Sequence, residues 1–193
     1  MNGATILIAG GGTGGHVYPA IAIGAELARR GHAPVFAGTA RGLEARIVPE
    51  HGYPLELVRV RGIRGRGIAG LLTALALPVA VMDALSILRR RRPAAVVGVG
   101  GYASGPCVAL AAALGKPTLI EEQNVVAGAT NRILGRIAGD VALPSEEARA
   151  SFGGRGFVAG VPVRAEFFGV KKNRGAVDRS VSSSSAEARG LTC

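Results

Sequence analysis

The sequence predicts an α/β fold built on a doubly wound parallel sheet. Short apolar runs alternate with longer segments of helical periodicity along most of the chain. This alternation is typical of βαβ units, in which parallel strands form a sheet that helices cover on both faces. Two of the apolar runs end in glycine-rich turns. Ligands of such sheets bind at the carboxyl ends of the strands, so residues that follow each run are the candidates for a functional site.

The expected elements follow one another in regular order. In the first helical segment, Val17, Ile21, Gly24 and Ala28 would share one face. The predicted strands are residues 5–9, 34–37, 55–60, 94–99, 118–121, 140–143 and 156–158. The predicted helices are residues 17–30, 42–50, 67–91, 105–114, 128–137 and 145–152.

The composition indicates a globular domain that meets anionic partners. Of the 193 residues 48% are hydrophobic, and the formal net charge is +10. Such a balance favours phosphates, nucleic acid or an acidic membrane surface. The basic residues are not interleaved with aromatic ones, so we expect no nucleic-acid partner. Cys107 and Cys193 are too far apart in sequence to suggest a metal site or a disulfide framework, and the absence of a leader signal predicts a cytosolic protein.

Two segments depart from the regular pattern. Residues 68–82 are apolar and uncharged, and the arginine run 89–92 follows them. Fifteen such residues are short of the roughly 20 that span a bilayer, which leaves a buried helix of the fold or a helix on a membrane surface with a basic rim that includes Arg61, Arg64 and Arg66. Residues 169–193 have no periodicity and few apolar residues, and are predicted to be a disordered tail unlike the body of the chain.

The first glycine turn, residues 10–15 with His16 directly after it, predicts a phosphate cradle. Glycines let the backbone approach a ligand, and a helix that starts there offers free N–H groups to an anion. The spacing also fits a dinucleotide fingerprint, but that reading needs an acid after the second strand, and Glu44 comes late in the sequence. A nicotinamide or flavin enzyme and a turn that binds nothing therefore remain as weaker alternatives.

Two further motifs follow strands. A second glycine turn occupies residues 98–106, with Ser104 as a plausible helix cap. Two such turns on one sheet could hold a diphosphate. The run Glu121-Glu122-Gln123-Asn124 offers carboxylates and amides that suit a ligand rich in hydroxyl groups, such as a sugar, although a solvated loop would also be polar. The turn 160–164, which ends in an arginine, could be a linker or a phosphate contact.

These motifs, in this order and spacing, resemble those of MurG-type N-acetylglucosaminyltransferases. The likeness rests on the first glycine turn with Pro19, the second turn with Tyr102, the cluster around Glu122 with Asn131, and the turn that ends at Arg164, and it covers residues 6–168. The resemblance implies a Rossmann-like, N-terminal half of a GT-B enzyme: an acceptor-binding domain at residues 1–160, the start of an interdomain linker at 161–168, and a non-homologous tail at 169–193 in place of the donor domain.

The resemblance also implies the chemistry. Members of the family transfer N-acetylglucosamine from UDP-GlcNAc to an undecaprenyl-diphosphate-linked muramoyl-pentapeptide, with inversion and without a required metal or other cofactor. They lie on the cytoplasmic face of the bacterial cell membrane as peripheral proteins. His16 matches the candidate general base. The UDP-GlcNAc side matches Thr13, Gly14, Gly15, Asn124 and Arg164. The acceptor and its diphosphate match Gly100, Gly101, Tyr102, Ser104, Glu122 and Asn131.

The chain departs from the family pattern at two positions within the resemblance. Glu121 stands where the family usually has histidine, and Val161 where it has asparagine. Because the donor domain has no counterpart in this sequence, we expect little or no transferase activity from the chain alone. A non-catalytic protein that binds a lipid diphosphate is the main alternative, and an NAD(P)-dependent oxidoreductase is a weaker one.

Overall fold

The computed structural model describes residues 3–60 and 68–163, and places them in an α/β domain around one parallel sheet. Seven strands pair in the order β3-β2-β1-β4-β5-β6-β7, and each pair is parallel. The strands are β1 (Thr5–Gly10), β2 (Ala33–Gly38), β3 (Leu55–Leu57), β4 (Ala95–Gly100), β5 (Thr118–Glu121), β6 (Asp140–Leu143) and β7 (Phe157–Val158). The predicted doubly wound parallel sheet is confirmed.

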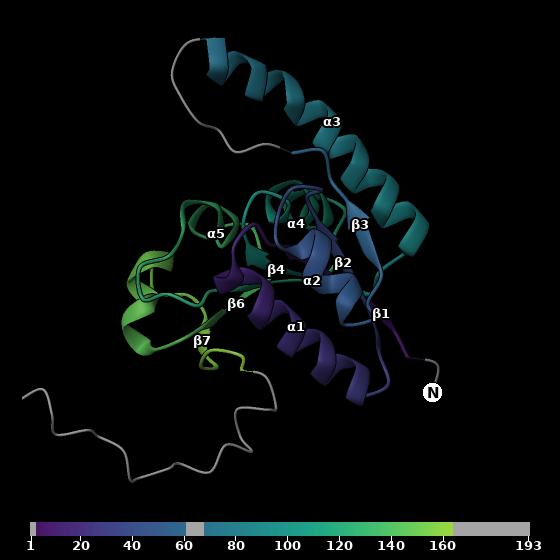
Figure 1. Cartoon of the computed structure of the whole chain (residues 1–193). Helices are drawn as coiled ribbons and strands as arrows, with labels where there is room; N and C mark the ends of the chain where they lie inside the picture. The colour runs from purple at the N-terminus through teal and green to yellow at the C-terminus, as the bar shows by residue number, and fades with distance from the viewer. Residues whose placement is uncertain (1–2, 61–67, 164–193) are drawn as a thin grey trace, which may run out of the picture.

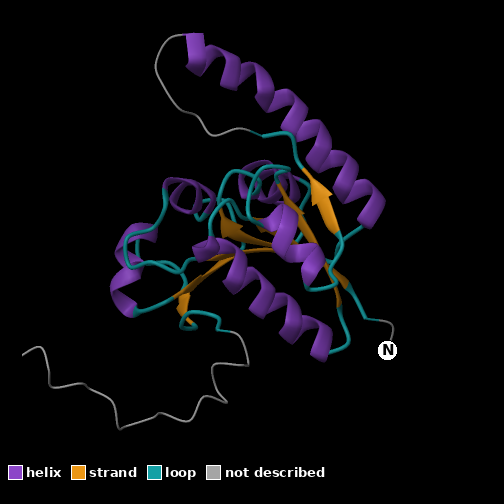
Figure 2. Ribbon diagram, viewed as in Figure 1, coloured by secondary structure: helices purple, strands orange, loops and turns teal. Residues whose placement is uncertain are grey.

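Helices cover both faces of the sheet, as Figures 1 and 2 show. They are α1 (Gly14–Arg29), α2 (Glu44–Glu50), α3 (Ile68–Arg91), α4 (Ser104–Ala113) and α5 (Ala129–Leu134), with a 3-10 helix, η1, at Glu146–Phe152. Every predicted element is present. The main differences are a β3 that ends at Leu57, a shorter α5, and a 3-10 helix where an α-helix was expected at 145–152.

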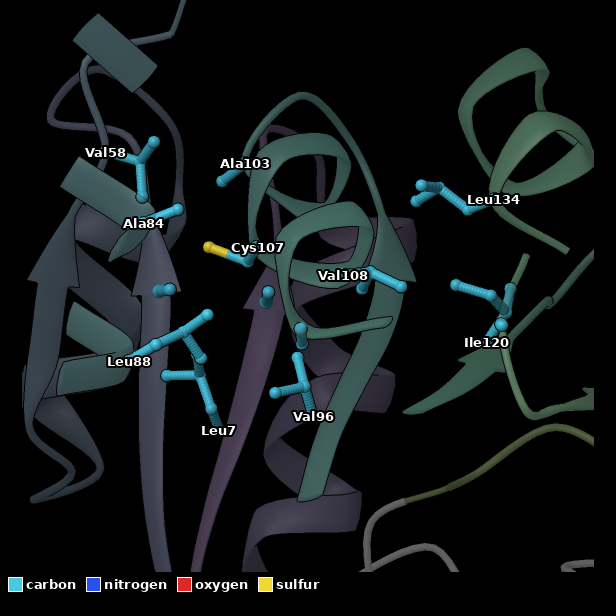
Figure 3. Close-up of a cluster of buried hydrophobic side chains, with 14 of the residues drawn as sticks. Leu7, Val58, Ala84, Leu88, Val96, Ala103, Cys107, Val108, Ile120 and Leu134 are labelled. Carbon is cyan, nitrogen blue, oxygen red and sulfur yellow. The ribbon is translucent and has the colours of Figure 1, made fainter. Parts of the chain in front are cut away.

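Alternation along the strands divides the core into two layers. In β1, Leu7 and Ala9 face one layer, and Ile8 between them faces the other. The first layer packs against α3 and α4, where Cys107 of α4 lies among Leu7, Val96 and Leu88 (Figure 3). The second layer lies under α1 and α2. Since successive strand residues point to opposite faces, an apolar strand covered on both sides is what a parallel sheet requires.

The long helix α3 has an unusual surface. Its buried residues, among them Ala80, Ala84 and Ile87, pack on the sheet, yet its middle exposes large apolar side chains, with Met82 67% exposed and Leu77 56% exposed. Its N-terminal end projects away from the other elements (Figure 1). No helix within the described ranges is both long and apolar enough to cross a membrane.

Two of the arginines that follow the apolar part of α3 form ion pairs with the edge of the sheet. Arg90 and Arg91 both bind Glu56 of β3, at 2.5 Å and 2.7 Å, and Arg59 binds Asp83 of α3 at 2.8 Å. These ion pairs fasten α3 to the edge of the sheet. The arginines predicted for the basic rim at 61, 64 and 66, and the predicted tail at 169–193, lie outside the described residues.

Candidate active site

The strand order reverses between β1 and β4, and the sequence motifs meet at that point. From β1 the chain proceeds outward to β2 and β3 on one side, and from β4 to β5, β6 and β7 on the other. The first glycine turn follows β1, the second follows β4, and the polar cluster begins at the end of β5. Open α/β sheets form a crevice where the order reverses, so three motifs far apart in sequence share one ligand-binding edge.

The two glycine turns touch backbone to backbone. The N–H of Gly11 donates to the carbonyl oxygen of Gly100 over 3.1 Å. Gly101 has φ +81°, and a Cβ built on it would lie 2.3 Å from the carbonyl oxygen of Gly11. Because no side chain fits there, the close approach of the turns requires glycine. The expectation that both turns contribute to one site agrees with this contact.

His16 lies in the first turn of α1 and is half-buried. Its Nδ1 is 3.0 Å from Oγ1 of Thr13, within hydrogen-bond distance. The other edge of the ring lies over Gly100, where a Cβ would come within 2.8 Å of Nε2. Thr13 occupies the N-cap position of α1 but makes no capping hydrogen bond with its side chain, so its hydroxyl is used to orient the imidazole. The histidine thus stands between the two glycine turns.

A cleft of about 360 Å³ brings most of the predicted residues together. Gly100, Gly101, Tyr102, Thr13 and His16 line it beside Glu122 and Asn131. Gly14 and Gly15 form the start of α1 next to the cleft but are not among its lining residues. Asn124 is exposed and does not line the cleft, and Arg164 lies outside the described residues.

Glu122 organises the loop after β5. The side chain is 1% exposed, and its two oxygens accept hydrogen bonds from five donors. The donors are the backbone N–H groups of Gln123, Asn124 and Gly128 and the side-chain amides of Asn124 and Asn131, at 2.9–3.2 Å. A carboxylate with so many protein donors has little capacity left for a ligand, so its contribution is to shape the cleft wall.

Asn131 presents an unused acceptor. Its Nδ2 donates to the carbonyl oxygen of Glu121 over 3.1 Å and to Glu122 over 3.0 Å. Its Oδ1 is buried and has no hydrogen-bond partner among the described residues. An unsatisfied buried amide oxygen costs free energy, and this one belongs to a residue that lines the cleft.

Ser104 was expected to cap α4, and this expectation is wrong. The N-cap residue is Ala103, and Ser104 is the first helical residue with no capping hydrogen bond. Its side chain is fully buried, and a Cβ on Gly98 would come within 2.6 Å of its Oγ. The hydroxyl therefore points back toward β4, because the missing side chain of Gly98 leaves room for it there.

Glu121 lies beside Glu122 and is 3% exposed. Burial raises the pKa of its carboxyl to about 7, and the neighbouring charge of Glu122 adds to the rise, whereas a hydrogen bond from Gln123 opposes it. One of its oxygens has no hydrogen-bond partner in the described part of the chain. Glu121 thus places a titratable acid next to Glu122, which lines the cleft.

Sequence reasoning missed Glu44, which it set aside as too late in the chain. The residue starts α2 and is 2% exposed. It accepts the N–H of Gly12 at 2.6 Å, and the N–H and hydroxyl of Thr39 at 2.8 Å and 2.9 Å. The available signal in the sequence was an acid that closely follows two glycines, Gly38 and Gly42, both of which lie against its carboxylate in the fold. Its carboxylate is occupied by hydrogen bonds from Gly12 and Thr39. It is therefore not available to bind a ribose as the acid of a dinucleotide site does.

A second cavity of about 700 Å³ adjoins the first and shares Gly12 and Tyr102 with it. Much of its wall is apolar, formed by Leu57, Val58, Val60 and Val79, and no motif in the sequence predicted this cavity. Tyr102 is half exposed and stands between the two cavities. Within residues 3–60 and 68–163, no three or more His, Cys, Asp or Glu side chains are grouped so that they could hold a metal ion.

The fold and the cleft define a glycosyltransferase-type α/β domain, and comparison with known proteins assigns the family. The glycosyltransferase family 28 N-terminal domain matches residues 6–143, and the chain belongs to this family.

Named relatives sharpen the comparison. The "UDP-N-acetylglucosamine--N-acetylmuramyl-(pentapeptide) pyrophosphoryl-undecaprenol N-acetylglucosamine transferase" of Myxococcus xanthus is 55% identical over 150 residues, which are 76% of this chain and 39% of the relative. The protein of the same name from Anaeromyxobacter dehalogenans is 52% identical over 163 residues, or 82% of this chain and 43% of the relative. The chain therefore spans about two fifths of the length of these relatives.

Solved structures agree with the assignment. The crystal structure of Acinetobacter baumannii MurG superposes with a TM-score of 0.68 at 33% identity, over 83% of this chain and 45% of that one. The Streptomyces glycosyltransferase SsfS6, complexed with thymidine diphosphate, has a TM-score of 0.54 at 14% identity over 74% of this chain and 49% of that one, which shows a shared fold alone.

Proposed function

We propose that this chain supplies the acceptor-binding part of a transferase that moves N-acetylglucosamine from UDP-GlcNAc to an undecaprenyl-diphosphate-linked muramoyl-pentapeptide. The relatives named above carry this activity in their names. The observation that carries the proposal is the meeting of both glycine turns with His16 and the β5 loop in one cleft at the reversal of strand order. The domain would occupy residues 1–160, with an interdomain linker starting at 161–168.

His16 is the proposed general base. In the tautomer that carries its proton on Nδ1, the imidazole donates to Thr13 Oγ1 and leaves Nε2 to accept the proton of the acceptor hydroxyl. A neutral imidazole has the ring nitrogen that a general base needs to take a proton from a hydroxyl group. The hydroxyl oxygen would attack the anomeric carbon of the donor sugar as UDP leaves, with inversion. Asn131, which lines the same cleft, would contribute to the binding site of the acceptor.

The diphosphate of the acceptor is assigned to the second glycine turn. Gly100, Gly101 and Tyr102 line the cleft, and α4 begins directly after them. Backbone N–H groups at a glycine turn and a helix N-terminus bind anions. Asn124 and Arg164 stay proposed for the donor side together with Thr13, Gly14 and Gly15. The exposed position of Asn124, outside the cleft wall, suits contact with a further domain.

The exposed apolar face of α3 would rest on the cytoplasmic surface of the bacterial membrane. Leu77, Val79, Val81 and Met82 lie exposed on this helix, and Arg89 follows them on the surface. An apolar patch beside cations binds anionic lipid. This placement would bring a lipid-linked acceptor to the apolar cavity next to Tyr102.

A chimera tests the proposed activity. Residues 1–163 of this chain are joined to the remaining C-terminal part of the Myxococcus xanthus relative, and labelled UDP-GlcNAc and lipid-linked acceptor are supplied. We expect disaccharide product, and a loss of at least roughly 100-fold in kcat for His16→Ala, since a general base contributes about 10²–10⁴-fold. Glu50→Gln, an exposed change on α2, is the matched control.

Two results would contradict the proposal. Full activity of the His16→Ala chimera would remove the histidine from the base role. A folded chimera that binds the acceptor but makes no product would favour the non-catalytic binding protein instead. The 193-residue chain assayed alone is expected to give little or no product.

A further inference from the structure

Glu44 joins two loops that the sequence keeps far apart. One oxygen of its carboxylate accepts the N–H of Gly12 in the first glycine turn, at 2.6 Å. The other accepts the N–H and the hydroxyl of Thr39, in the loop after β2, at 2.8 Å and 2.9 Å. Three donors converge on a side chain that is 2% exposed. Hydrogen bonds to a charged acceptor are stronger than those between neutral groups, so this contact ties the two loops firmly.

Three glycines make the space that this side chain fills. A Cβ built on Gly11, Gly38 or Gly42 would lie 2.4 Å, 2.3 Å or 2.1 Å from the nearest Glu44 side-chain atom. A Cβ does not approach a non-bonded heavy atom so closely, so a larger residue at any of these positions would displace the carboxylate. The chain therefore encloses one acid with glycines from β2, the loop before α2 and the first glycine turn.

Gly11 connects the Glu44 carboxylate to the residues that line the cleft. Gly11 borders the carboxylate on one side and donates to the carbonyl oxygen of Gly100 on the other, at 3.1 Å. Its own carbonyl oxygen faces Gly101, and His16 lies over Gly100. A displacement of the first turn by a few tenths of an ångström would therefore move both the second turn and the base. The N–H of Gly12 is also occupied by Glu44, so this amide is not offered to a ligand phosphate.

We propose that Glu44 is a positioning residue of the transferase site, whose carboxylate fixes the first glycine turn against the second and thereby sets where His16 stands. Its role in catalysis rests on the function proposed above for the cleft. Its role in loop geometry can be measured without that function. Glu44 acts through Gly12 and Gly11 and touches no reacting atom.

The test uses the isotopically labelled 193-residue chain and Glu44→Gln, which keeps the shape of the side chain but replaces one acceptor oxygen by a donor. Amide resonances of Gly12 and Gly101 and the imidazole resonance of His16 are recorded, and the dissociation constant for geranyl diphosphate is measured. Glu50→Gln is the matched control, because Glu50 ends the same helix and is exposed, and its carboxylate lies 3.7 Å from the guanidinium group of Arg46 on the surface. If Glu44→Gln does not fold, Glu44→Asp replaces it, because the shorter side chain cannot reach both loops.

We expect Glu44→Gln to move the resonances of Gly101 and His16 and to weaken geranyl diphosphate binding at least roughly tenfold, while Glu50→Gln changes neither. Unmoved Gly101 and His16 resonances would overturn the proposal, and so would moved resonances with an unchanged dissociation constant. If the unsubstituted chain does not bind geranyl diphosphate, the proposed acceptor role of the cleft is wrong. The positioning role of Glu44 is then judged from His16 alone: a moved His16 resonance in Glu44→Gln supports it, and an unmoved one overturns it.

Discussion

Replacement of Glu121 by glutamine should remove the pH dependence that this buried acid imposes on the free energy of unfolding. The carboxyl lies behind the cleft, 3% exposed, beside the buried Glu122. Burial and the Glu122 charge raise its pKa from 4.5 to about 7 in the folded protein. An unfolded chain would release the proton near the ordinary value. The folded state therefore holds the proton more tightly than the unfolded chain, and the stability that this carboxyl contributes falls as the pH rises from about 4.5 to about 7.

The size of the effect follows from the two pKa values. Each pKa unit corresponds to about 1.4 kcal/mol, so a rise from 4.5 to about 7 amounts to about 3 kcal/mol. The contribution is complete below about pH 4.5 and is lost as the pH rises through 7. Glutamine has the same shape, stays neutral, and can still accept the hydrogen bond from Gln123.

Urea unfolding at pH 5, 6, 7 and 8 measures the difference in unfolding free energy between the variant and the unsubstituted chain. Taking this difference removes the contributions of the other titratable groups. We expect the stability of Glu121→Gln relative to the unsubstituted chain to rise by about 2.5 kcal/mol between pH 5 and pH 8, because part of the full effect is already lost at pH 5. A difference that stays constant across this range would show that Glu121 has an ordinary pKa, and would refute the reasoning from burial.

Two further changes probe the turn contact and the surface of α3. Gly101→Ala should destabilise the fold by about 2–4 kcal/mol in urea unfolding, because φ is +81° and the new Cβ would meet the carbonyl of the first turn, whereas Gly105→Ala, with nothing within 4 Å, should cost nothing. Equal stability of the two variants would contradict the close approach of the turns. Met82→Asp should lower sedimentation with anionic vesicles roughly tenfold, and high salt should lower that of the unsubstituted chain. Leu114→Asp, at an exposed apolar site directly after α4, should not lower it. Vesicle binding that survives Met82→Asp would place the membrane contact elsewhere.

Local patterns were enough to predict the elements of this fold. Apolar runs such as the one in β4 are buried on both faces, so they stand out from the helices between them. The sequence could not give the order of strands, because β1 pairs with β4 rather than with a neighbour in sequence on that side. Pairing is decided by tertiary packing, yet the topology rule for such sheets correctly placed the candidate motifs at the carboxyl ends of the strands.

The glycine turns of the candidate site could be predicted from the sequence, whereas the buried polar side chains beside them could not. The two glycine turns and His16 were identified from residue type and spacing, and they do line one cleft. Ser104 looked like a cap by its place before a helix, but the space left by Gly98 draws its hydroxyl inward. Glu44 was dismissed because its sequence distance from β2 did not fit a ribose ligand, whereas its actual partner is the glycine turn itself.

The acceptor role of the cleft is tested most directly by mapping amide chemical shifts of the 193-residue chain during titration with geranyl diphosphate. A site at the reversal of strand order predicts perturbations confined to residues 11–16, 100–104 and 122–131, with the largest at Gly101 and Tyr102. Saturable perturbations confined to other parts of the chain, or none at millimolar probe, would contradict the assignment of the diphosphate to the glycine turns.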